Sequence, residues 1–561
     1  APPGVDRAAI AYDRPMSYTL ADIERVKLVV GLEVHVELAT RTKMFSRAPN
    51  PAHPEFDPHA SGHERAGPGP NTPGPNTPGP NTWIDPTVLG LPGALPVLNR
   101  AAIETSMMVG LALGCEIAQT TKWDRKSYFY PDLPKAYQIS QYDLPLCFDG
   151  SLDVPAVDAK GQIDFEQPPT RIGIVRAHLE EDAGKLLHEL PGGGALDATI
   201  ADYNRAGTPL LEIVTQPDFT TADQVVTFCR MLRNICRFLG ASEGVMQKGH
   251  IRFEPNINTH LTLRDGHVVR TPIVEVKNLN SFKSVKSAIE YEAAQQPARW
   301  LRDGRVFGPG TKQTRGWNEH AAPEAGPGRG ATVLQREKED AHDYRYFPDP
   351  DLPPVRIDEA WKAGVRERIP ELPLARFRRY MDEFGLGPKE AAALIDERDV
   401  CFFFERSLSC MEALGLSHAR AGKLAANLLL QSGAKRANEL QREVHELGAQ
   451  AEDIAALGVL REQGKLNNQN VDELFGVLCE SPTGLRQPGE SLARVEEMAA
   501  QRGMLVVRDE GAMNAWIDAA LAEQAQAAAD VRAGKQAAIG RLVGAAMKHA
   551  GGKADAKALR E

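Results

Sequence analysis

The sequence predicts an α+β protein in which a sheet-rich part precedes an all-helical part. Between Leu28 and Arg345, short β-type runs such as 28–38 and 251–257 occur with few long helical patterns. After Pro354 the chain becomes rich in Ala, Leu, Glu and Arg, its apolar residues follow helical spacing, and strand signals are nearly absent. We therefore expect two structurally different regions in one chain.

Composition sets limits on the class of protein. The chain has 561 residues, 42% of them hydrophobic, which is enough for two to four domains. Its net charge is −10, so a polyanionic partner would need a local basic patch. There is no apolar run long enough to cross a bilayer, residues 1–16 lack a secretory pattern, and the seven cysteines form no C-x-x-C pair. We expect a cytoplasmic protein with reduced cysteines and no membrane association.

Two segments rich in Pro and Gly predict exposed loops. The segment 57–85 contains a near-repeat of Asn-Thr-Pro-Gly, and the segment 308–330 is similarly rich in Pro and Gly. Prolines lack the backbone donor that helices and sheets require. Both segments are therefore predicted to be surface excursions.

The first acidic pattern lies in the predicted strand 31–38. A period of two places Glu33, His35 and Glu37 on one face and aliphatic residues on the other. An ordinary strand with one solvated face gives the same alternation. The strand alone does not decide between a functional acidic face and an ordinary solvated one.

Further acids occur in three other segments. Residues 180–182 are three consecutive acids before a glycine, a pattern of either a solvated turn or a cation-binding segment. Glu212 is the one charge in the apolar run 210–214, and Glu254 lies between Phe253 and Pro255. Mg²⁺ prefers carboxylate and phosphate oxygens, and a histidine can complete the ligand set of Mg²⁺, Mn²⁺ or Zn²⁺. The acids and His35 thus suit a metal–phosphate site.

Two segments could supply the basic groups that such a site needs. Residues 123–135 and 343–351 combine Arg or Lys with aromatic residues and prolines. Phosphoryl transfer depends on positioning and charge neutralisation, although a proline-rigidified loop packed by its own aromatics explains the composition equally. The chain carries no P-loop, dinucleotide-binding or kinase signature.

Several strings, in order, resemble the B subunit of the Asp/Glu-tRNA amidotransferase. They are 31–38 (GLEVHVEL), 93–99 (GALPVLN), 124–132 (DRKSYFYPD), 135–141 (KAYQISQ), 179–185 (LEEDAGK), 204–214 (NRAGTPLLEIV), 275–282 (EVKNLNSF) and 343–352 (DYRYFPDPDL). The end, 542–554, resembles the family's tRNA-contacting helical tail, so that the resemblance extends from about Val26 to the C-terminus.

The resemblance implies the domain order. We expect an N-terminal extension at 1–25 and a glutamine-synthetase-like catalytic cradle with a mainly antiparallel sheet at 26–355. A helical connecting domain at 356–416 and a helical, YqeY-like tRNA-binding tail at 417–561 should follow.

The resemblance also implies the reaction. In this family, ATP phosphorylates the side-chain carboxylate of Glu-tRNA(Gln) or Asp-tRNA(Asn), and ammonia then displaces the phosphate. A separate amidase subunit releases that ammonia from glutamine, and a small third subunit completes the heterotrimer. ATP, Mg²⁺ and aminoacylated tRNA are therefore the expected cofactors and partner.

Site residues carry over by motif. Glu33, His35, Glu181 and Glu212 match the family's metal ligands, and Lys126 matches a basic residue near the reacting phosphate; Lys126, Glu181 and Glu212 are the expected catalytic set. Glu254 is the fifth expected ligand, at a position where the family usually has Asp.

Some positions depart from the family pattern. Gln247 replaces a usual acid and His250 a usual serine. The Asn-Thr-Pro-Gly repeat stands where relatives often have a zinc-binding pair of C-x-x-C motifs, so we expect no structural zinc.

The C-terminal segment 531–560 is basic, with seven Lys or Arg against one acid and a local charge of +6. We expect Arg541, Lys548 and Lys553 to contact tRNA phosphates, although a solvated amphipathic helix end would give the same composition.

Two other readings stay open. The departures at Gln247, His250 and Glu254 are compatible with a non-catalytic tRNA-binding scaffold. A ligase acting on a small molecule is a third reading, and the basic tail argues against it.

Overall fold

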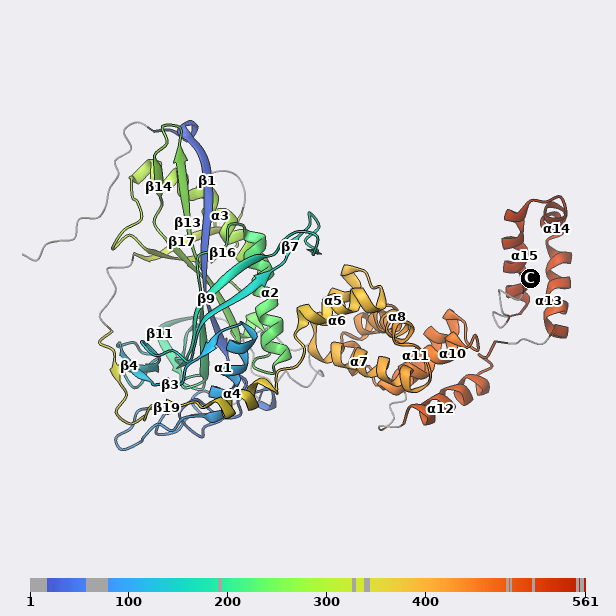
Figure 1. The fold of residues 1–561 in the computed structure, drawn as a ribbon, viewed down its shortest axis with the longest axis horizontal. Helices are drawn as coiled ribbons and strands as arrows, with labels where there is room; N and C mark the ends of the chain where they lie inside the picture. Colours follow the sequence, from blue (N-terminus) through green and yellow to red (C-terminus); the bar gives the residue numbers. More distant parts are fainter. Residues whose placement is uncertain are drawn as a thin grey trace, which may run out of the picture. The chain divides into compact units, whose positions relative to one another are not determined.

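The computed structural model describes residues 18–56, 79–189, 194–324, 329–337, 344–480, 484, 487–506, 510–550, 554 and 559–560. The chain forms two compact units, which meet in sequence between Leu374 and Ala375 (Figure 1). The finer boundaries expected at 25/26, 355/356 and 416/417 stay predictions, although the first strand already begins at Ile23.

The first unit is built on a ten-stranded sheet. Its order is β17-β16-β15-β13-β1-β12-β9-β6-β2, and β14 pairs with β13. Of the pairings described, β15–β16 is parallel and the others are antiparallel. The α+β class with a mainly antiparallel sheet is therefore confirmed. The strands are β1 (Ile23–Glu37), β2 (Glu116–Ile117), β6 (Cys147–Val154), β9 (Thr170–Glu181), β12 (Pro209–Thr215), β13 (Ile251–Leu263), β14 (Val268–Arg270), β15 (Val274–Lys277), β16 (Gln313–Asn318) and β17 (Ala331–Glu337).

One face of this sheet packs against helices α1 (Arg100–Ala112), α2 (Ala222–Phe238) and α3 (Phe282–Asp303). Leu32, Val34 and Val36 of β1 are at most 1% exposed and belong to the apolar core that includes these helices. Burial of aliphatic side chains is the main stabilising term for such a layer. Because neighbours along a strand point to opposite faces, Glu33 and His35 project from the face away from this core.

Smaller sheets lie beside the large one. The order β18-β4-β5 joins β18 (Phe347–Pro348), β4 (Asp124–Ser127) and β5 (Tyr137–Ser140), while β3 (Thr120–Thr121) pairs with β19 (Val355–Arg356). Two hairpins, β7 (Ala156–Val157) with β8 (Ile163–Asp164) and β10 (Lys185–Glu189) with β11 (Ala195–Asp202), complete the described strands. The two segments that combine basic and aromatic residues are thus joined by backbone pairing of β4 with β18.

The expected surface excursion at 308–330 contains a strand instead. β16 occupies its middle and extends the large sheet beside β15. The Pro and Gly residues that suggested a loop flank this strand on either side. Of the other predicted loop, residues 57–78 lie outside the described part of the chain.

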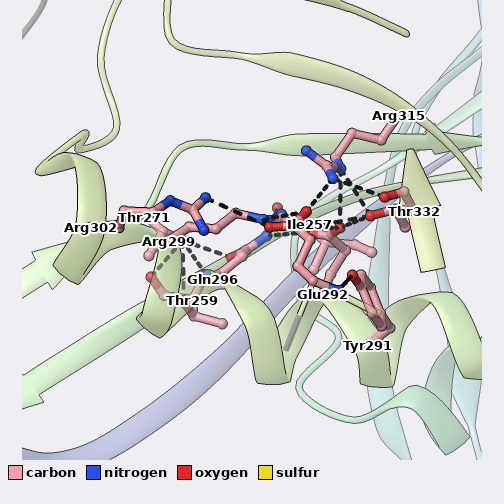
Figure 2. Close-up of polar contacts among 11 residues, drawn as sticks. Ile257, Thr259, Thr271, Tyr291, Glu292, Gln296, Arg299, Arg302, Arg315 and Thr332 are labelled. Carbon is pink, nitrogen blue, oxygen red and sulfur yellow. Dashed lines mark hydrogen bonds and ion pairs between the residues drawn. The ribbon is translucent and has the colours of Figure 1, made fainter. Parts of the chain in front are cut away.

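A buried polar network ties the β16–β17 edge to α3 (Figure 2). Glu292 of α3 is fully buried, and its carboxylate accepts hydrogen bonds from Arg299 at 2.7 and 3.2 Å and from the Thr332 hydroxyl of β17. The guanidinium of Arg315, on β16, lies 3.7 Å from the same carboxylate and also pairs with Glu324. Buried charges need such partners, so this network fixes the edge strands on the helix.

After β19 the described chain is helical. Its α-helices are α4 (Glu359–Arg366), α5 (Pro373–Phe384), α6 (Pro388–Asp396), α7 (Arg398–Ala413), α8 (His418–Leu428), α9 (Ala434–Leu440), α10 (Ala451–Glu462), α11 (Asn468–Glu480), α12 (Pro488–Gln501), α13 (Glu510–Glu523), α14 (Ala525–Arg532) and α15 (Ile539–His549). An apolar cluster that includes Ala520, Ala545 and Ala546 joins α13 to α15. This confirms the change of character that the sequence predicts after Pro354. In the described residues, we find no helix with the length and apolarity needed to span a bilayer.

Candidate active site

Four of the predicted ligands meet on the face of the sheet opposite the helices. His35 stands opposite Glu212 of β12, and Glu33 stands opposite Glu254 of β13. Directly opposed residues of antiparallel strands project to the same side. His35 Nε2 lies 3.6 Å from Glu33 Oε1 and 3.6 Å from Glu212 Oε2, and its Nδ1 lies 3.9 Å from Glu254 Oε1. We call this set, with the residues added below, the acidic cluster.

Strand β9 adds His178 and Glu180 to the acidic cluster. His178 is opposite Glu212, and its Nε2 lies 3.6 Å from Glu212 Oε2. Glu180 accepts a hydrogen bond from the Ser140 hydroxyl at 3.2 Å. Both side chains are about 3% exposed, so the solvated turn considered for this segment is wrong. The spacing of two between His178 and Glu180 was the available signal for their shared face.

Strand β15 adds Glu275 and Lys277, which sequence reasoning also missed. Lys277 Nζ lies 2.6 Å from Glu254 Oε2 and 3.5 Å from Glu275 Oε1. The Thr314 hydroxyl of β16 donates to Glu275 Oε2 at 3.0 Å. Both residues belong to a string that pointed to the family, and their alternation along a short strand was too brief to single them out.

Glu181 is not part of the acidic cluster. It is 3% exposed, forms an ion pair with Lys135 and accepts a hydrogen bond from the Ile139 backbone N–H at 3.0 Å. Consecutive strand residues face opposite sides, so Glu180 and Glu181 cannot share a face. The structure therefore brings Glu180, and not Glu181, to Glu212 in the acidic cluster. The metal-ligand role expected of Glu181 stays a prediction.

The donor set fits a hard divalent cation. Three groups have ligand atoms that all lie within 4.8 Å of one another: Glu33, His35 and Glu212; His178, Glu180 and Glu212; and Glu33, Glu254 and Glu275. Glu33 and Glu212 belong to two groups each, so the groups are contiguous. Carboxylate oxygens in this number are the ligands that Mg²⁺ and related ions prefer.

Electrostatics are consistent with excess negative charge in the cluster. Burial, together with Glu212, raises the pKa of Glu33, and the same two causes raise the pKa of Glu180 to about 7. Burial would raise the pKa of Glu212 as well, but His178, His35 and Lys126 hold it below its usual range. A bound cation would relieve the repulsion that remains.

Lys126 lies at the edge of the acidic cluster, on β4. Burial acts to lower its pKa, but Glu180, Tyr346 and Glu212 raise it above the usual range. Its Nζ also lies 5.1 Å from the centre of the Tyr344 ring. The predicted basic residue is thus a permanent positive charge beside Glu180 and Glu212.

Glu37 projects from the same face but takes part in a separate contact. Arg252 Nη1 lies 3.7 Å from Glu37 Oε1, and Arg252 Nη2 lies 3.1 Å from Asp182 Oδ2. The Glu37 carboxylate therefore shares the Arg252 guanidinium with Asp182.

Comparison with known proteins identifies the family. Residues 28–363 match the GatB/GatE catalytic domain, and residues 412–561 match the GatB domain. The chain belongs to the GatB family. It is similar to the B subunit of the aspartyl/glutamyl-tRNA(Asn/Gln) amidotransferase of Thermomicrobium roseum, with 40% identity over 95% of this chain and 96% of the relative. It is likewise similar to the protein of that name from Rhodopirellula baltica, with 38% identity over 93% of each chain.

The positions at which this GatB family member departs from the expected pattern have different surroundings. Gln247 is exposed, whereas His250 is buried. Glu254 reaches both His35 and Lys277. The extra methylene of Glu254 does not remove its carboxylate from the acidic cluster.

Two of the three predicted tRNA contacts lie on α15, within the GatB domain match. Arg541 and Lys548 are exposed on α15. Lys553 lies outside the described residues. Two of the three proposed contacts are therefore accessible to a partner.

Proposed function

We propose that this chain is the amidating subunit of a tRNA-dependent amidotransferase, a glutamine-hydrolysing, ATP-dependent carbon–nitrogen ligase. ATP phosphorylates the side-chain carboxylate of misacylated Glu-tRNA(Gln), Asp-tRNA(Asn) or both, and ammonia displaces the phosphate to give the amide. The observation that carries the proposal is the contiguous set of carboxylates and imidazoles with Lys126 at its edge. Membership of the GatB family supports it.

The chain's own residues position charge for this reaction. Glu33, His35 and Glu212, together with Glu180 and Glu254, would hold Mg²⁺. Bound there, Mg²⁺ would supply charge neutralisation for the phosphate oxygens and the substrate carboxylate.

The chain needs no covalent nucleophile of its own. The substrate carboxylate attacks the γ-phosphorus of ATP and releases ADP, and ammonia then attacks the resulting acyl phosphate and releases phosphate. Lys126 opposes the negative charge that gathers on the transferred group.

The proposal includes partners. An amidase subunit would release ammonia from glutamine, and a small third subunit would complete the heterotrimer in the cytoplasm. The word "subunit" in the relatives' name supports a multi-chain assembly. Aminoacylated tRNA would contact Arg541, Lys548 and Lys553 of the basic tail.

The test is glutamine- and ATP-dependent amide formation by the complex assembled with the amidase and the small third subunit. Glu212→Gln should lower the rate at least about a hundredfold, the scale at which lost charge stabilisation acts. The dissociation constant for tRNA should change less than about twofold, because phosphate contacts dominate tRNA affinity. Glu166→Gln, an exposed acid outside the acidic cluster, is the matched control.

Unchanged turnover by Glu212→Gln would overturn the assignment. A non-catalytic scaffold predicts that the unmutated complex binds tRNA without any ATP hydrolysis stimulated by aminoacyl-tRNA. A small-molecule ligase predicts that removing 531–561 leaves substrate affinity and its salt dependence unchanged.

A further inference from the structure

Exposed aromatic side chains gather around the small sheet β18-β4-β5. Among the described residues, four of the five exposed aromatic side chains lie there: Phe129 is 84% exposed, Tyr130 58%, Tyr142 57% and Phe347 45%. Exposed apolar groups that cluster in this way mark interaction surfaces more often than isolated ones do. Tyr142 combines this exposure with a defined packing geometry.

Tyr142 belongs to a continuous row of four rings. It stacks on Tyr346 with ring centroids 4.3 Å apart and an angle of 14° between the ring planes. Tyr344 packs edge-on against Tyr346 at 6.2 Å and against Tyr128 at 6.4 Å. We call Tyr128, Tyr344, Tyr346 and Tyr142 the tyrosine row. Its exposed end is the ring of Tyr142.

The inner part of the tyrosine row adjoins the acidic cluster. Lys126 Nζ lies 5.1 Å from the Tyr344 ring centre, and the same ammonium group interacts with Glu180 and Glu212. Burial raises the pKa of Tyr346 to about 12; Lys126 opposes this rise, and the charges of Glu180 and Glu212 add to it. The row therefore runs from the edge of the cluster to solvent.

This arrangement matches what the substrate requires. In the proposed reaction, the amino acid is esterified to the 3′-terminal nucleoside of tRNA, so that nucleoside must lie within one amino-acid length of the cluster. The terminal nucleotides are unpaired, and unpaired bases bind proteins by stacking on aromatic rings. A ring row that begins at the cluster and ends in solvent provides such faces.

We propose that Tyr142, supported by Tyr346, stacks an unpaired 3′-terminal base of the aminoacyl-tRNA and so directs the attached amino acid to the acidic cluster. The inference rests on the proposed function and names the residues that position the substrate. Tyr142 is a positioning residue, because it contacts the nucleotide rather than the reacting atoms.

The experiment measures the dissociation constants of two tRNAs for the assembled heterotrimer and its Tyr142 variants. Two probes are used: intact tRNA, and the same tRNA without its unpaired 3′-terminal nucleotides. Tyr142→Ala should raise the dissociation constant of the intact tRNA about fivefold or more and that of the truncated tRNA less than about twofold. Tyr142→Phe retains the ring and should bind intact tRNA like the unmutated complex. Phe307→Ala removes an exposed aromatic ring elsewhere in the same unit and should change neither constant.

Three outcomes would overturn the proposal. One is an equal loss of affinity for the two tRNAs. Another is full affinity in Tyr142→Leu, because an apolar contact would then suffice. The third is failure of Tyr142→Ala to assemble with the amidase and the small third subunit, because the row would then be a protein interface.

Amide formation by the unmutated complex separates this proposal from the proposed function. If the unmutated complex forms the amide, but Tyr142→Ala weakens the binding of both tRNAs equally, only the stacking inference fails. If Tyr142→Ala weakens the binding of intact tRNA more than that of truncated tRNA, but the unmutated complex forms no amide, the proposed function fails. Stacking at Tyr142 is then still supported.

Discussion

Glu180 and Glu181 are neighbours on β9, each about 3% exposed, yet their carboxylates have unrelated partners. Glu180 lies with His178 and Glu212 in the acidic cluster, whereas Glu181 pairs with Lys135 and the Ile139 backbone. The two residues form a matched pair: they have the same side chain and the same burial, but they project from opposite faces of β9.

We expect Glu180→Gln to weaken Mg²⁺ binding about tenfold or more, because it removes one carboxylate from the ligand set. Glu181→Gln should leave Mg²⁺ affinity within about twofold and lower the free energy of unfolding by about 3 kcal/mol, because the Lys135 ammonium stays buried without its partner. Calorimetric Mg²⁺ titration and thermal unfolding of both variants give the two readouts. Weaker Mg²⁺ binding by Glu181→Gln than by Glu180→Gln would contradict the placement of Glu180 in the site.

Lys126 should act on rate rather than on tRNA affinity. Lys126→Met removes a positive charge beside Glu180 and Glu212, and we expect kcat for amide formation to fall about a hundredfold with KM for aminoacyl-tRNA nearly unchanged. Lys126→Arg retains the charge and should recover part of the rate. Steady-state kinetics of the assembled complex provide the test, and a rise in KM at constant kcat would argue that Lys126 only binds substrate.

The period of a β-strand was sufficient to place Glu33 and His35 on one face, and the family resemblance brought Glu212 and Glu254 to the same site. Neither the strand period nor the resemblance was sufficient to choose between Glu180 and Glu181, because both lie in one string of consecutive acids. That choice depends on the register of β9 with β12, in which His178 stands opposite Glu212. Pairings between strands distant in sequence fix such a register, and a local pattern does not contain them.

Lys277 and the strand β16 were missed for a related reason. Both depend on the edge of the sheet, where β15 pairs in parallel with a strand from a segment rich in Pro and Gly. The turn-forming residues around β16 dominated the local signal, while tertiary pairing determined the structure.

Glu254 offers a test of how much ligand length matters. The resemblance implies that the family usually has Asp here, and Glu254 contacts both His35 and Lys277. Glu254→Asp should retain Mg²⁺ affinity within about fivefold, whereas Glu254→Gln should weaken it about tenfold or more, because the charge rather than the extra methylene holds the ion. Equal affinities of the two variants in a Mg²⁺ titration would remove Glu254 from the ligand set.

The buried network on α3 should be a determinant of stability. Arg299 and Arg315 share two carboxylates, the buried Glu292 and the partly exposed Glu324. Glu292→Gln removes the buried one, and we expect a loss of about 3 kcal/mol in the free energy of unfolding. Glu290→Gln, on the same helix, removes an exposed acid 3.8 Å from Lys286 and should cost less than about 1 kcal/mol. Denaturant unfolding compares the two, and similar costs would contradict a stabilising role for the network.

The basic tail should bind tRNA through phosphate neutralisation. Arg541 and Lys548 are exposed on α15, so replacing either by Ala removes a charge without removing a core contact. Each replacement should raise the dissociation constant for tRNA and reduce the slope of log Kd against log salt by about 0.7–0.9, because one fewer counterion is released. Lys389→Ala, an exposed lysine on α6, is the control for a general charge effect. If Arg541→Ala weakens binding at every salt concentration by one constant factor, the contact is not to a phosphate. The basic composition of the tail would then be explained by a solvated amphipathic helix end.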